Sequence, residues 1–125
     1  MAKKIFVDAN KRVKITVERG AQSNHRIEIK RKVLDITEQL QPKTNIANGA
    51  SNKLTFRYAS ISEPSIFILV PEYFYREREH SPGRWTSNTL KEIKNFQEGN
   101  HKVLNFADND IHDDEFDLQV HFVIH

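Results

Sequence analysis

The feature that most constrains the fold is an alternation of apolar and polar residues along several short segments. In residues 13–17, 27–29, 54–58 and 118–124, an apolar side chain occupies every second position. Successive side chains of a β-strand point to opposite faces of a sheet, so a spacing of two predicts strands with one buried face and one exposed face. Residues 66–70 are apolar throughout, which predicts a strand that is covered on both faces.

Turn-forming pairs such as Asn48-Gly49 and Pro82-Gly83 separate these segments. Their intervals of about 10–20 residues are typical of an antiparallel sandwich. We therefore predict one all-β domain over residues 1–125, an antiparallel β-sandwich of about seven or eight strands, with a flattened barrel as the alternative. A chain of 125 residues suits a single domain with a substantial core.

Two local features interrupt this pattern. Leu90, Ile93 and Phe96 recur at every third position, so residues 88–97 predict one short helix. The phase of the alternation also slips after Ile29, which indicates either a β-bulge or a turn at that point.

Charge is distributed unevenly along the chain, although the formal net charge is only +2. Residues 1–34 carry ten basic and three acidic side chains, whereas residues 105–125 carry six acidic side chains and neither Lys nor Arg. Either the first and last strands are neighbours whose charges partly cancel, or the basic end of the molecule meets the acidic end of a partner and orients the association. Five basic side chains are predicted to share one exposed sheet face: Arg12, Lys14, Arg26, Lys30 and Lys32.

Such a basic face suits another protein or an acidic membrane surface. Nucleic acid is disfavoured as a partner, because single-strand binding also uses exposed aromatic side chains and the basic segments contain none.

Residues 108–115, with the sequence Asp-Asn-Asp-Ile-His-Asp-Asp-Glu, concentrate carboxylates in one predicted loop. Calcium prefers six to eight oxygen ligands on a flexible loop. The candidate metal ligands are Asp108, Asp110, Asp113 and Asp114. An EF-hand is excluded, because the loop position that requires glycine holds Asp113.

This segment of about ten residues resembles the late calcium loop of C2 domains, where Asp-x-Asp and a further Asp lie between the last strands of a β-sandwich. The resemblance implies a sandwich of the C2 or jelly-roll kind, with calcium as the cofactor. It also implies docking on acidic lipid or protein through the loop and a basic sheet face. The alternative interpretation is a hairpin loop that its charges keep solvated.

Residues 73–85 combine aromatic side chains with alternating Arg and Glu before the only Trp of the chain. Arg, Tyr and Trp are enriched at the energetic centres of protein interfaces, and aromatic rings also stack on sugars. The candidate interface residues are Tyr73, Tyr75, Arg76, Arg78, Arg84 and Trp85. The alternative is that the aromatic side chains face the core and that residues 76–79 form a solvated hairpin.

The sequence offers little support for catalysis. The absence of cysteine excludes disulfide scaffolds, thiol nucleophiles and cysteine-based zinc fingers, and no nucleophile elbow, phosphate loop or dinucleotide motif is present. His121 and His125 share one face of the last predicted strand but lie about 13 Å apart. A zinc site would therefore need histidines from other strands, or His112 together with Asp108 or Asp110. We therefore expect no enzymatic activity.

The first apolar stretch ends at Asp8, which is too early for a secretory signal. The longest apolar run, residues 66–71, is far shorter than the roughly 20 residues that span a bilayer. We therefore expect cytoplasmic synthesis without a signal peptide or transmembrane segment. The leading functional prediction is a structural or protein-interaction module, a subunit of an oligomer or larger particle. A calcium-dependent C2-like module is the alternative, and a lectin-like carbohydrate binder is the third.

Overall fold

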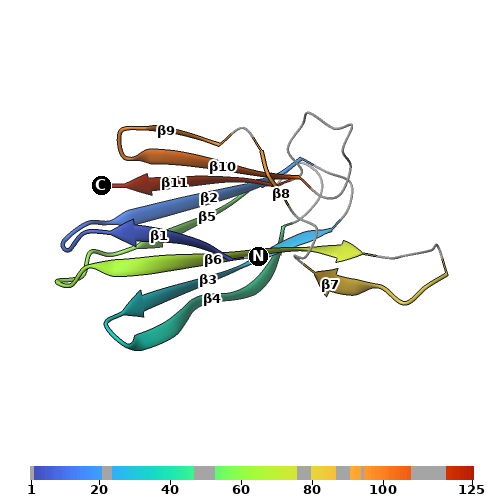
Figure 1. The fold of residues 1–125 in the computed structure, drawn as a ribbon, viewed down its shortest axis with the longest axis horizontal. Helices are drawn as coiled ribbons and strands as arrows, with labels where there is room; N and C mark the ends of the chain where they lie inside the picture. The colour runs from blue at the N-terminus through green and yellow to red at the C-terminus, as the bar shows by residue number, and fades with distance from the viewer. Residues whose placement is uncertain are drawn as a thin grey trace.

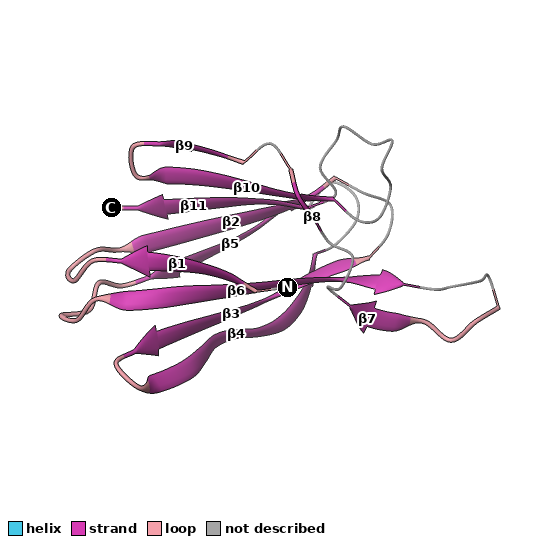
Figure 2. Ribbon diagram, viewed as in Figure 1, coloured by secondary structure: helices cyan, strands magenta, loops and turns pink. Residues whose placement is uncertain are grey.

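The computed structural model describes residues 2–20, 24–46, 53–75, 80–86, 91–93, 95–107 and 118–125. These residues form two antiparallel β-sheets that pack together, and none of them is helical (Figures 1 and 2). The prediction of an all-β antiparallel sandwich is therefore confirmed. The described residues also include no helix with the length and apolar character needed to cross a bilayer.

Sheet A contains strands β1 (Lys3–Val7), β3 (His25–Val33), β4 (Ile36–Ile46), β6 (Ser65–Tyr75) and β7 (Arg84–Thr86). The strand order is β1-β6-β3-β4, and β7 pairs with the last three residues of β6, beyond the stretch that pairs with β1. The long strand β6 therefore organises the sheet, because it pairs with three of the other four strands.

Sheet B has the order β5-β2-β11-β10-β8, with β9 also paired to β10. Its strands are β2 (Val13–Arg19), β5 (Lys53–Tyr58), β8 (Lys91–Glu92), β9 (Phe96–Glu98), β10 (His101–Ala107) and β11 (Leu118–Ile124). The consecutive strands β1 and β2 lie in different sheets, and so do β2 and β3. Residues of β2 therefore lie in a different sheet from the residues of β1 and β3 that are close to them in the sequence.

The predicted helix at residues 88–97 is wrong over its described part, where two short strands lie along the edge of β10. If these residues were helical, the side of β10 opposite β11 would have no strand partner. The Ile93 amide instead donates to the Asn105 carbonyl at 2.8 Å, and the Asn105 amide donates to Asn95 Oδ1 at 2.8 Å. Phe96 is 56% exposed, so the expected apolar stripe buries little surface at this position. Short strands of this kind raise the number of described strands to eleven, above the seven or eight predicted.

The phase slip after Ile29 has two causes, a shift in strand register and a turn, and the sequence allowed either one. The pairing of β3 with β4 shifts register between Ile27 and Lys30, and β3 then ends at Val33 in a turn. Leu34 occupies that turn with a φ of 53°, a left-handed conformation that is uncommon for a residue other than glycine.

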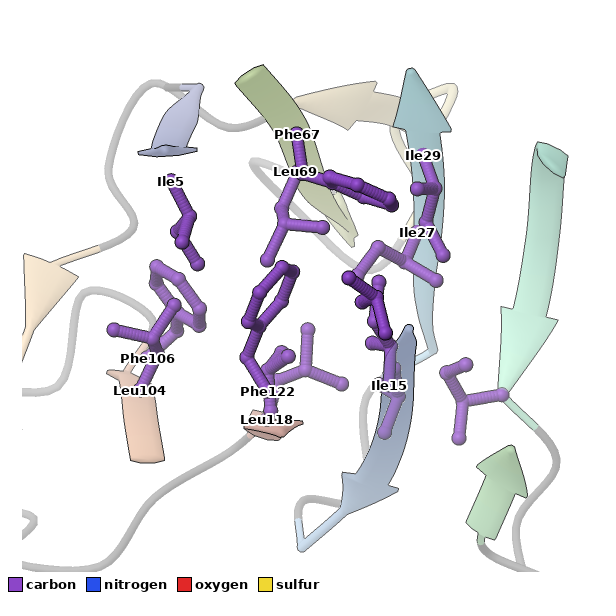
Figure 3. Packing of buried hydrophobic residues seen from close by; sticks show 14 of the residues in the cluster. Ile5, Ile15, Ile27, Ile29, Phe67, Leu69, Leu104, Phe106, Leu118 and Phe122 are labelled. Carbon is purple, nitrogen blue, oxygen red and sulfur yellow. The ribbon is translucent and has the colours of Figure 1, made fainter. Parts of the chain in front are cut away.

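The core lies between the sheets and consists of the inward-facing residues of both (Figure 3). Alternate residues of β2 and β11 are buried, as the spacing of two predicts. Full burial of one such side chain contributes about 1.5–3 kcal/mol. Fully buried members from both sheets include Ile5, Ile27, Ile29, Phe67, Leu69, Ile15, Phe106, Leu118 and Phe122.

The expectation that residues 66–70 are covered on both faces is wrong. Phe67 and Leu69 point into the core, whereas Ile66, Ile68 and Val70 are only half-buried on the outer face of sheet A. The neighbouring strands β1 and β3 cover the two edges of β6 but leave this outer face partly open to solvent.

Candidate functional site

The structure divides the five predicted basic residues between two surfaces. Arg26, Lys30 and Lys32 lie on the outer face of sheet A, because β3 pairs with β6 and β4. Lys14 lies on the outer face of sheet B, because β2 pairs with β5 and β11. Arg12 is exposed immediately before β2. The five residues therefore do not share one sheet face, contrary to the prediction.

On the outer face of sheet A, apolar side chains lie between lysines. Phe6 is 61% exposed, and its opposite neighbour Ile66 is half-buried. Two adjacent cross-strand rows form this surface, which we call the lysine-flanked face: Phe6, Ile66 and Lys32 in one row, and Lys4, Ile68 and Lys30 in the next. Directly opposed side chains lie about 4.5–5.5 Å apart, so the lysines border the apolar centre closely.

Further along the same face, Arg26 joins a carboxylate to an aromatic ring. Its Nε donates to Glu72 Oε1 at 3.0 Å, and its guanidinium carbon lies 4.3 Å from the centre of the Trp85 ring. The Trp85 ring packs edge to face on Phe74, with 5.5 Å between the ring centres. Lys43 Nζ also lies 3.5 Å from Glu72 Oε1. Arg26 thus holds the β6–β7 hairpin against β3.

The predicted interface residues are only partly available for contact. Tyr73 is 4% exposed because it shares the inward face of β6 with Phe67 and Leu69, so its assignment to an exposed contact surface is wrong. Trp85 is half-buried and Arg84 is exposed. The Tyr75 side chain and the candidate residues Arg76 and Arg78 lie outside the described residues.

The candidate calcium ligands Asp108, Asp110, Asp113 and Asp114 all lie outside the described residues as well. Calcium binding by residues 108–115 therefore stays a prediction. Within the described part of the chain, no three His, Cys, Asp or Glu side chains are grouped as metal ligands.

The outer face of sheet B contains a groove with a volume of about 260 Å³. Strands β2, β5, β10 and β11 contribute its walls. The lining side chains include Lys14, Thr16, Glu18, Lys53, His101 and His121.

The two histidines of this groove contact each other. His101 Nε2 lies 2.9 Å from His121 Nδ1, and the two ring centres are 5.2 Å apart. On its other side, His121 Nε2 lies 2.8 Å from Gln119 Oε1. Gln119 Nε2 in turn donates to Asn105 Oδ1 at 2.8 Å. A continuous chain of hydrogen bonds thus connects β10 and β11 across this surface.

The surroundings of His121 favour its neutral form. Burial lowers the pKa of His121 below its usual value, and the adjacent His101 lowers it further. Glu18 raises the pKa in opposition, whereas Lys53 lowers it. A neutral imidazole keeps one nitrogen lone pair available as a hydrogen-bond acceptor or a metal ligand.

Sequence reasoning did not identify this histidine pair. Residues 101 and 121 are twenty positions apart, and His101 precedes a segment without regular alternation. The register that opposes Val103 to His121 and His101 to Val123 makes the two histidines diagonal neighbours. Residue type and spacing do not give the register between β10 and β11 that brings the two histidines together.

Comparison with protein-family models, with curated protein sequences and with solved structures finds no match to this chain.

Proposed function

We propose that this protein is a non-enzymatic interaction module that assembles with further copies of itself through the lysine-flanked face. The observation that carries this proposal is the 61% exposure of Phe6 on the edge strand β1, next to Ile66 and Ile68 of β6, which are only half-buried. Contiguous apolar surface with a polar rim is the usual composition of a protein contact site.

The charge of this face determines the kind of contact. Lys4, Lys30 and Lys32 border the apolar side chains, and of these lysines only Lys30 has a nearby carboxylate, Glu28 at 3.6 Å, among the described residues. A symmetric pairing of two such faces would oppose lysines to lysines, which is unfavourable. The face therefore suits an acidic surface.

The chain itself carries a complementary acidic region, since residues 105–125 contain six acidic side chains and no Lys or Arg. The partner of this face is therefore the acidic part of the sequence of a second copy, in a head-to-tail contact. Contacts of this kind form rings when they close and filaments when they do not.

Sedimentation velocity over a wide range of protein concentrations tests this proposal. We expect oligomers that dissociate at high salt, because salt screens exposed charges. Phe6→Ser and Lys32→Glu should each shift the protein to monomer. Phe96→Ser is the matched control, because Phe96 is also strongly exposed, at 56%, but lies on sheet B. A wild-type protein that is monomeric at every concentration would overturn the proposal. Oligomers that persist in both the Phe6→Ser and the Lys32→Glu variants would also overturn it.

The sequence of residues 108–115 supports a second candidate, a calcium-dependent module that binds acidic lipid or protein. The test is a thermal melt in EDTA, in Ca²⁺ and in Mg²⁺. Saturation at 100 times the dissociation constant stabilises a protein by about 2.7 kcal/mol. The Asp108→Asn, Asp110→Asn double variant should lose a Ca²⁺-specific shift. Carbohydrate binding is a weaker candidate, because Tyr73 is buried and Arg26 lies over the Trp85 ring.

A further inference from the structure

We propose that His101 and His121 form a binding site for a divalent transition-metal ion of the Zn²⁺ or Cu²⁺ type on the outer face of sheet B. The observation that carries this proposal is the separation of 2.9 Å between His101 Nε2 and His121 Nδ1, two nitrogens from neighbouring paired strands. The site lies on a different sheet from the lysine-flanked face.

The distance between the two nitrogens is close to the separation that a metal ion requires. Zinc–nitrogen bonds of 2.0–2.1 Å at a tetrahedral angle place two ligand nitrogens about 3.3 Å apart. The pair at 2.9 Å therefore has to open by roughly 0.4 Å. The two half-buried side chains on the outer face can accommodate a change of this size by small rotations.

Gln119 and Asn105 orient the His121 ring for this role. Gln119 Nε2 donates to Asn105 Oδ1 at 2.8 Å, which turns Gln119 Oε1 toward His121 Nε2. The proton of His121 then resides on Nε2, and the lone pair of Nδ1 faces His101. Histidine ligands of metals usually donate their second ring N–H to a carbonyl or carboxylate in this way. His101 becomes a ligand through Nε2 when its proton resides on Nδ1.

The charges around the pair are mixed. Glu18 provides a negative charge beside His121, whereas Lys14 and Lys53 line the same groove and oppose a cation. Lys53 Nζ lies 3.9 Å from Glu18 Oε2, so part of its charge is balanced locally.

The ligand atoms select the class of metal. Imidazole nitrogen suits Zn²⁺, Cu²⁺ and Ni²⁺, whereas Ca²⁺ and Mg²⁺ prefer oxygen ligands. The described residues supply no third His, Cys, Asp or Glu to this group, so water completes the coordination. An incomplete protein ligand set leaves positions open for exchange, as in the open coordination position of catalytic zinc sites.

The test is a titration of the untagged protein with ZnCl₂ and, separately, with CuSO₄. Calorimetry measures the binding, and NMR monitors the signals of the histidine rings. We expect one saturable site that perturbs His101 and His121, and no response of these signals to CaCl₂. Spin-resonance spectra of the Cu²⁺ form should show two nitrogen ligands. A pH decrease should weaken binding, because protons compete for both rings.

Variants separate this site from other metal-binding groups of the chain. His101→Ala and His121→Ala should each weaken binding at least tenfold, and Gln119→Ala should weaken it by about 10- to 100-fold, the effect typical of a residue that orients a ligand. His80→Ala is the matched control and should bind as the wild type does, because His80 is exposed in the loop before β7. Circular dichroism checks that each variant is folded. If a histidine-to-alanine variant is not, His101→Gln or His121→Gln replaces it at the same position. The absence of saturable binding, or binding that both histidine variants retain, would overturn the proposal.

Discussion

The Phe67 ring of sheet A packs edge to face on the Phe122 ring of sheet B, with 5.5 Å between the ring centres and 77° between the ring planes. Both side chains are almost completely buried, and β6 and β11 are interior strands of their sheets. This contact therefore joins the two layers near the middle of the core (Figure 3).

Replacement of the Phe122 ring should destabilise the whole sandwich. Phe122→Ala removes buried apolar surface and leaves a cavity beside Phe67, so we expect a loss of about 3–5 kcal/mol in the free energy of unfolding. Denaturant titration measures this loss. Phe96→Ala is the control, because the Phe96 side chain is 56% exposed and should change stability little. Equal effects of the two variants would contradict the placement of the core.

The second prediction concerns the close approach of Gly83 to Phe74. A Cβ atom at position 83 would lie 2.1 Å from Phe74 Cζ, and the Phe74 ring is itself packed on Trp85. Gly83→Ala should therefore force the ring or the hairpin to move, at a cost of about 1–3 kcal/mol. The fluorescence of Trp85, the only Trp of the chain, should report the change.

Gly99→Asn is the control for the Gly83 variant. Gly99 has a φ of +57°, which asparagine tolerates, and no atom lies within 4 Å of a Cβ built at this position. This variant should leave the Trp85 emission unchanged. A Gly83→Ala protein with wild-type stability and emission would contradict the described packing of the β6–β7 hairpin.

Tyr58 makes a third prediction, because it has a buried hydroxyl without a hydrogen-bond partner among the described residues. Its ring packs 5.8 Å from that of Phe67, and burial raises the pKa of Tyr58, while Arg31 partly opposes this rise. Tyr58→Phe keeps the ring and removes the unpaired polar atom. We therefore expect the free energy of unfolding to increase by about 1 kcal/mol. A decrease of similar size in chemical denaturation would show that the hydroxyl has a partner.

The alternation in the sequence was sufficient to predict the sandwich, because burial of one face determines which residues of β2 and β11 point inward. It was not sufficient to identify β8 and β9, since strands of two or three residues contain no recognisable period. The regular spacing of Leu90, Ile93 and Phe96 suggested a helix, but the unpaired edge of β10 determined the structure of its described part.

The surface residues were harder to predict than the core. Alternation identifies Lys14 and Lys30 as outward-facing, but only the strand pairing places them on different sheets. The same limit applies to His101 and His121, whose contact depends on the register between β10 and β11. Residue type and spacing therefore indicate which side chains are exposed, and long-range pairing decides which of them meet.

The fourth prediction concerns pH. Burial and the neighbouring His101 lower the pKa of His121 in the folded protein, whereas in the unfolded chain it should be close to the usual value of about 6.5. The unfolded state therefore binds a proton more readily, and His121 should reduce stability as the pH falls below about 6.5, until the folded pKa is passed. The midpoint of thermal unfolding should decrease across this window. His121→Gln should decrease less steeply, and His80→Gln should follow the wild type, because His80 is exposed. The same slope in all three proteins would show that the His101–His121 contact does not perturb the titration of His121.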